Sequence, residues 1–238
     1  MMTTTATLTS GPGPAGAQPA GRPPGTAGTG QARPWPDTAR RAAVIAGMTV
    51  PAAFYAIIIV LGQVTPGYDP VSRFASELSL GRYGAVMIAG FIATGLAELA
   101  LGLSLRPVLG PRRPGRIAAA MIAVAGLGFL VAGIFVTDPG GQVHTIHGAL
   151  HFAAAIVLFF AAVPAAALAM ARRYRHQRGF AAYSALTGAA TPVLFIATVA
   201  SGHLLGVMER IVIGVVLAWL TAVAIRLHQG KLTDAPAP

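Results

Sequence analysis

The stretch 84-GAVMIAGFIATGLAELALGLSL-105 decides the fold, because its 22 residues carry only one ionisable side chain, that of Glu98. About 20 apolar residues in a helix cross the ~30 Å hydrocarbon core of a membrane. Five other stretches have a similar length and character, so the sequence predicts six transmembrane helices. The predicted spans are 42–64, 84–105, 117–136, 148–170, 180–200 and 204–227.

The composition agrees with an all-α fold, a polytopic bundle of six transmembrane helices. Of the 238 residues, 55% are hydrophobic and 10% are charged, whereas about a quarter of the residues of a soluble domain are charged. The chain contains no cysteine, which excludes disulfides and thiolate metal ligands. Any bound metal would therefore need histidine and carboxylate ligands.

The distribution of lysine and arginine indicates the orientation in the membrane. A net charge of +10 suggests nucleic acid as a partner, but 14 of the 17 basic residues lie on one predicted side. By the positive-inside rule that side is cytoplasmic, so we predict a bacterial cell-membrane protein with both termini in the cytoplasm. Its expected partners are membrane lipids and no nucleic acid. The three basic residues on the external side are Arg73, Arg82 and Arg210.

The two ends of the chain differ in character from the spans. Residues 1–38 are rich in Gly, Pro and Ala and contain no apolar run, which predicts a disordered cytoplasmic tail and no cleavable signal peptide. Residues 39–230 form the predicted transmembrane domain, and residues 231–238 form a short cytoplasmic C-terminal tail.

Acidic and imidazole groups gather on the external side. They come from the first, third and fifth connections and from the first turns of the helices that follow. Segments distant in sequence thus meet at one membrane face, as when a helix bundle builds a site. This set comprises Asp69, Glu77, Asp138, Glu209, His144, His147, His151 and His203.

The connection 67-GYDPVSRFASELSLGRYG-84 predicts a short external interfacial helix between the first and second spans. Asp69 is a good N-cap before a proline at the first helical position, and the helix would run to about Leu80. Asp69, Arg73 and Glu77 are spaced four apart, so they would share one face. Two interpretations stay open here, a weak surface ladder or a helix that dips into the bundle.

The connection 137-TDPGGQVHTIHGALHF-152 carries three histidines spaced by three and four residues. If the fourth span begins near Gln142, His144, His147 and His151 lie along one stripe. These imidazoles are candidate zinc ligands, with Asp138, Glu77 or Glu209 supplying an oxygen. The alternative is that they serve as interfacial hydrogen-bond donors.

The last span must begin within 201-SGHLLGVMER-210, because the apolar run after it has only 15 residues. Glu209 and Arg210 therefore lie one to two turns inside the membrane, which makes them candidates for a functional site. Alternatively they form buried ion pairs with Asp138 or Glu77. Glu98 is expected to reach toward Arg106 or the arginines of the following connection at the cytoplasmic side, rather than to serve a transport role.

The chain resembles the DUF998 family of bacterial integral membrane proteins over about residues 42–228. The similarity rests on PGYDPVSRFASEL, YGAVMIAGFIATGL, GIFVTDP, HTIHG and MERIVIGVVLAW. The family has no assigned function, so the resemblance implies a six-helix bundle and no particular chemistry.

The first functional hypothesis is an intramembrane enzyme acting on a lipid or isoprenoid. In a metal form, zinc on the three histidines activates water for hydrolysis, with Asp138 or Glu209 as general base. In a metal-free form, a protonated Glu77, Asp138 or Glu209 protonates an alkene and starts a cyclisation. The candidate catalytic residues are Glu77, Asp138, Glu209 and His147, and the candidate substrate or ion-pair residues are Asp69, Arg73, Arg210 and His203.

Two further hypotheses need no catalysis. A structural or accessory membrane protein would use the external cluster as a network that joins six closely packed, Gly- and Ala-rich helices. A small transporter is less consistent with the sequence, since the spans offer few polar groups beyond Glu98. The sequence does not predict the oligomeric state.

Overall fold

The computed structural model describes residues 1–5, 7 and 36–233. Within these residues six helices are long and apolar enough to cross a membrane, which confirms the predicted all-α fold with six spans. The predicted tails fall mostly on residues 6, 8–35 and 234–238, outside the described part. The spans are Asp37–Val64 (α1), Gly84–Leu109 (α2), Arg113–Ile134 (α3), Ile146–Arg173, Arg178–Ala200 (α6) and Gly202–His228.

Two of the spans are composite. The fourth consists of α4 (Ile146–Ile156), a π-helical segment η3 (Val157–Ala162) and α5 (Val163–Arg173). The sixth begins with a 3₁₀ turn, η4 (Gly202–Leu204), and continues as α7 (Leu205–His228). π-helical turns are rare and often lie at functional sites, so η3 is a candidate position for a functional site in the fourth span.

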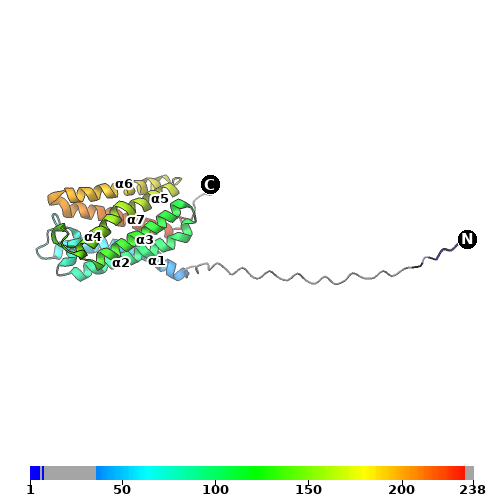
Figure 1. Ribbon diagram of the computed structural model, residues 1–238, viewed down its shortest axis with the longest axis horizontal. Helices are drawn as coiled ribbons and strands as arrows, with labels where there is room; N and C mark the ends of the chain where they lie inside the picture. The colour runs from blue at the N-terminus through cyan, green and yellow to red at the C-terminus, as the bar shows by residue number, and fades with distance from the viewer. Residues whose placement is uncertain (6, 8–35, 234–238) are drawn as a thin grey trace. The chain divides into compact units, whose positions relative to one another are not determined.

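The spans pack as a closed series. Each span contacts the next span along the chain, and α7 packs against α1. The six spans run side by side in Figure 1. One end of the bundle, here called the His-rich end, holds the connections 65–83, 135–145 and 201–204. The opposite, Arg-rich end holds the connections 110–112 and 174–177 and the turn after α7. Which end faces the cytoplasm stays a prediction.

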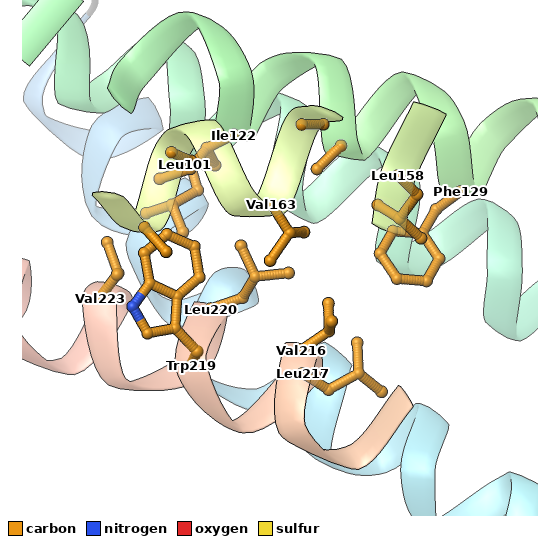
Figure 2. Close-up of a cluster of buried hydrophobic side chains, with 14 of the residues drawn as sticks. Leu101, Ile122, Phe129, Leu158, Val163, Val216, Leu217, Trp219, Leu220 and Val223 are labelled. Carbon is orange, nitrogen blue, oxygen red and sulfur yellow. The ribbon is translucent and has the colours of Figure 1, made fainter. Parts of the chain in front are cut away.

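Apolar side chains fill the centre of the bundle (Figure 2). Trp219, Leu101 and Ile122 come from three different helices, and each is completely buried. At the α2–α3 contact the backbones approach closely, because a Cβ added at Gly95 would lie 2.8 Å from the carbonyl oxygen of Gly126. Such small-residue packing replaces the hydrophobic driving force that a bilayer does not supply.

The connection between α1 and α2 differs from the prediction. The α-helix expected from Asp69 does not form; the backbone makes a turn at residues 70–72, followed by a 3₁₀ helix, η1 (Ala75–Leu80). Asp69 still caps the turn, since its carboxylate accepts hydrogen bonds from the Val71 N–H at 3.0 Å and from the Ser72 hydroxyl. The third connection contains a short 3₁₀ turn, η2 (Pro139–Gly141).

Candidate functional site

Arg210 joins the first connection to α7. Its buried guanidinium donates hydrogen bonds to the carbonyl oxygens of Pro70 and Gly206, each at 2.9 Å, and to the Tyr68 hydroxyl at 2.7 Å. The predicted ion pair with Asp138 or Glu77 is wrong, because no carboxylate of the described residues pairs with Arg210. Neutral oxygens therefore satisfy this buried cation.

Tyr68 links Arg210 to the rest of the first connection through hydrogen bonds. Its hydroxyl lies 2.9 Å from the carbonyl oxygen of Phe74, to which it donates. Burial raises the pKa of the Tyr68 phenol, and the adjacent Arg210 only partly offsets this effect. Tyr68 thus stays protonated and serves as both a donor and an acceptor between α7 and the loop.

Arg73 and Glu77 form the ion pair that their spacing predicted. The Arg73 Nε and Nη2 atoms lie 2.9 and 2.6 Å from Glu77 Oε2, and Glu77 is buried. Asp69 does not join this ladder; hydrogen bonds from the Ser72 hydroxyl and the Val71 N–H lower the pKa of its carboxyl. The carboxylate of Glu77 is therefore ion-paired with Arg73 at the His-rich end.

Asp138 builds the start of α4. Its carboxylate accepts hydrogen bonds from the N–H groups of His144 and Thr145, at 2.7 and 2.8 Å, and from the Thr145 hydroxyl at 2.8 Å. These bonds, led by that from His144, lower the pKa of Asp138. Thr145 in turn accepts from the Gly148 N–H at 3.0 Å as the N-cap. A side chain on Gly148 would overlap the Asp138 carboxylate, so the His-x-x-His-Gly pattern has a structural role here.

The three histidines of the third connection do not converge. Helix α4 begins at Ile146 rather than near Gln142, so His144 precedes it and only His147 and His151 share a stripe. His144 and His147 are exposed, whereas His151 is buried. In the described residues no three His, Asp or Glu side chains lie close enough to hold one metal ion, so the geometry does not fit the predicted zinc site.

His151 instead points its ring at the end of α3. Its Nδ1 atom lies 3.0 Å from the carbonyl oxygens of both Ala132 and Phe135. Carbonyls only accept hydrogen bonds, so the neutral ring carries its proton on Nδ1 and leaves Nε2 as an acceptor. These carbonyls belong to the last turn of α3 and its C-cap, where helical partners are missing.

Glu209 is buried in the first turns of α7. One of its carboxylate oxygens accepts a hydrogen bond from the N–H of Ala75, the first residue of η1. No salt bridge to Glu209 occurs among the described residues. Glu209 thus differs from Glu77, because backbone N–H groups of Ala75 and Ser76 rather than a cation engage its carboxylate.

A cavity of about 180 Å³ near the His-rich end brings Glu209 and His151 to one space. The other polar groups in its wall are Ser76, Thr137 and Gln142. Seven of the ten phenylalanines of the chain also line this cavity, and they come from several different helices and from the first connection. These are Phe54, Phe74, Phe91, Phe129, Phe152, Phe159 and Phe195. We call this space the aromatic cavity.

The aromatic rings pack in an ordered way around the aromatic cavity. Phe54 and Phe91 have ring centroids 4.9 Å apart, and the ring centroids of Phe91 and His151 lie 5.9 Å apart in a T-shaped arrangement. Phe159 of η3 stacks on Phe195 of α6 at 4.8 Å. The π-helical segment thus places an aromatic ring between the fourth and fifth spans.

Part of the wall of the aromatic cavity lies on the outer surface of the bundle. Helix α5 packs along α6, whereas α4 makes no extensive contact with α6 among the described elements. Phe152 of α4 and Val199 of α6 both line the cavity and are exposed. The wall of the aromatic cavity therefore reaches the surface of the bundle at these two residues.

The remaining predicted residues lie elsewhere. His203 is exposed in η4. The expectation that Glu98 reaches toward Arg106 is wrong, since Glu98 is 0% exposed and both of its carboxyl oxygens have no hydrogen-bond partner among the described residues. The aromatic lining was not predicted, because no span contributes more than two of the phenylalanines and the sixth span contributes none.

Comparisons with known proteins give one match. A family model described as "Protein of unknown function (DUF998)" matches residues 48–226. No curated protein and no solved structure matches the chain.

Proposed function

The chain belongs to the DUF998 family, and we propose that it is an intramembrane enzyme that moves protons to and from the hydrocarbon of a bound lipid or isoprenoid. One observation carries this proposal: an acid, a base and seven phenylalanines line the same cavity. The apolar walls suit a hydrocarbon chain, and a few placed polar groups suit the chemistry.

Glu209 is the proposed acid. As a carboxylic acid it gives its proton to one carbon of a carbon–carbon double bond; the O–H bond breaks, the π electrons form the new C–H bond, and a carbocation remains. The faces of aromatic rings attract cations, so the phenylalanines stabilise this carbocation. The hydrogen bond from the Ala75 N–H holds the carboxyl group in place.

His151 is the proposed base. Its Nδ1–H is held by two carbonyls, so the Nε2 lone pair is available to take a proton from the carbon next to the carbocation. The electrons of that C–H bond form a new double bond, and the product is a shifted or cyclised isomer. The proton passes from His151 to water and a proton from water returns to Glu209, so the cycle needs no oxidant or reductant.

The other predicted catalytic residues fit this chemistry less well. Asp138 accepts three hydrogen bonds and Glu77 pairs with Arg73, and neither is among the residues that line the aromatic cavity. His147 is exposed, with its ring against Phe135 at 5.4 Å. We assign these three residues to the scaffold that positions η1 and α4.

A direct test measures proton transfer without knowing the natural substrate. Purified protein is incubated in D₂O with farnesol or a longer polyprenol, and deuterium in the recovered prenol is measured by mass spectrometry. We expect incorporation by the wild type and a loss of about 10²–10⁴-fold in Glu209→Gln and in His151→Gln. Exposed His147→Gln and His203→Gln are the matched controls and should keep the wild-type rate.

The structural alternative gives a different result. If the polar groups only hold the helices together, Glu209→Gln lowers the thermal stability and no variant changes deuterium uptake. Uptake by the folded Glu209→Gln protein at the wild-type rate refutes the assignment of the acid.

A further inference from the structure

The turn after α7 folds back onto the connection between α5 and α6 at the Arg-rich end. The Tyr174 hydroxyl donates to the carbonyl oxygen of Leu232 at 2.6 Å, and the Gln177 side-chain amide donates to that of Lys231 at 3.1 Å. An open, shallow pocket lies at this end of the bundle, opposite the end that holds the aromatic cavity. The pocket is lined by Gln177, Arg178, Gly179, Phe180, Arg226 and Lys231.

Three of the residues that line this pocket, Arg178, Arg226 and Lys231, are cationic, and the part of the chain that the structure describes adds no acidic residue to its wall. Arg178 and Lys231 are exposed, so their side chains are free to move toward a ligand. A cluster of three cations favours an anion with several oxygen atoms.

Arg226 is held in a fixed position within the pocket. Its guanidinium carbon lies 4.3 Å from the centroid of the Phe180 ring, and its Nη2 atom donates to the side-chain oxygen of Gln177. Its Nε atom is buried and has no hydrogen-bond partner among the described residues. This preorganised cation therefore keeps a donor that the described residues do not use.

The start of α6 adds to the same pocket. Helix α6 begins at Arg178, its N-cap Gln177 makes no side-chain cap hydrogen bond, and its first turn has no acidic residue. The first N–H groups of a helix lack internal partners and carry a partial positive charge. Together with three cations, they complete a site with the chemistry of a phosphate receptor.

Helix α6, which begins at this pocket, carries exposed apolar side chains further along its length. Leu186 and Val193 lie seven residues apart on one face of α6 and are 69% and 63% exposed. A ligand that matches both features has a phosphate at one end and hydrocarbon chains at the other. We propose that the pocket binds the phosphate of an anionic phospholipid, whose acyl chains lie along this face of α6.

The experiment measures lipid retention by native mass spectrometry of the delipidated protein in detergent, with phosphatidylglycerol and phosphatidylcholine as probes. Wild type should bind phosphatidylglycerol more tightly. The double variant Arg178→Gln, Lys231→Gln should weaken that binding by roughly 30-fold and leave phosphatidylcholine binding unchanged. Both residues are exposed, and a thermal melt checks that the variant is folded.

The matched control removes the same charge at the same end of the bundle. Arg112 and Arg113 are exposed and do not line the pocket, so Arg112→Gln, Arg113→Gln should keep the preference for phosphatidylglycerol. An equal loss in both double variants overturns the proposal, since it reports surface charge alone. Wild type that binds inorganic phosphate but does not prefer phosphatidylglycerol also overturns it, because the site would then be a receptor for free anions.

Discussion

Replacing Glu98 with methionine should stabilise the protein. Glu98 lies on α2 between two apolar contacts with α1, where Phe91 meets Phe54 at 4.9 Å and where Leu101 approaches Gly47. Both of its carboxyl oxygens are buried without a partner among the described residues. Methionine has a similar length and no group that needs a hydrogen bond.

The magnitude follows from the cost of a buried polar group without a hydrogen bond, about 1–3 kcal/mol. Glu98→Met should raise the free energy of unfolding by that amount. In a chain of this size, each kcal/mol shifts the melting temperature by about 2–4 °C, so we expect a rise of about 2–12 °C. The assay is a thermal melt in detergent, followed by circular dichroism.

The matched control is Leu101→Met, one turn further along α2 and also fully buried. A volume-conserving apolar exchange of this kind costs less than about 1.5 kcal/mol, so the control should melt at or slightly below the wild-type temperature. A melting temperature of Glu98→Met clearly below that of the control would refute the reasoning. Such a result means that the Glu98 carboxyl has a partner, such as water or an ion, that stabilises the fold.

Three further predictions concern the His-rich end. Gly148→Ala should destabilise by about 1–3 kcal/mol, because its methyl group displaces the Asp138 carboxylate from its three donors; a thermal melt equal to that of the wild type would contradict this. The pKa of Asp138 is lowered in the folded protein. Its ionised carboxylate therefore stabilises the fold at pH values above its ordinary pKa of 3.8, and this contribution is lost as the pH falls through the folded-state pKa. The difference in melting temperature between wild type and Asp138→Asn should therefore shrink from pH 6 to pH 3, and a constant difference would argue against this role. Tyr68→Phe removes an acceptor from Arg210 and should cost about 1–3 kcal/mol in the same melt, whereas Tyr83→Phe, whose hydroxyl makes no hydrogen bond to another described residue, should cost little.

The sequence allowed the spans to be predicted to within a few residues at most ends, because only long apolar runs can cross a bilayer. The predicted fourth span, 148–170, begins two residues after the start of α4, but the helix start near Gln142 on which the stripe of three histidines depended is too early. The hydrogen bonds from His144 and Thr145 to Asp138 keep residues 142–145 out of the helix, and these contacts depend on a carboxylate that the pattern of histidines does not reveal.

The interior of the bundle was harder to predict. In a membrane both the lipid-facing and the core-facing sides of a helix are apolar, so hydropathy does not reveal the rotation of α2 that buries Glu98. For the same reason the convergence of seven phenylalanines was not visible in the sequence. The burial of Arg210 was expected, but its carbonyl and phenol partners follow from how the first connection folds over α7.

The most direct test of the central claim locates a bound hydrocarbon chain. A polyprenol carrying a photoactivated diazirine near its hydroxyl end is crosslinked to the purified protein, and the labelled residues are identified by mass spectrometry. We expect labelling at Phe152, Phe159 and Phe195 in the wall of the aromatic cavity, with competition by unlabelled polyprenol. Labelling confined to outward-facing residues such as Leu186 and Val193, without competition, would contradict the account.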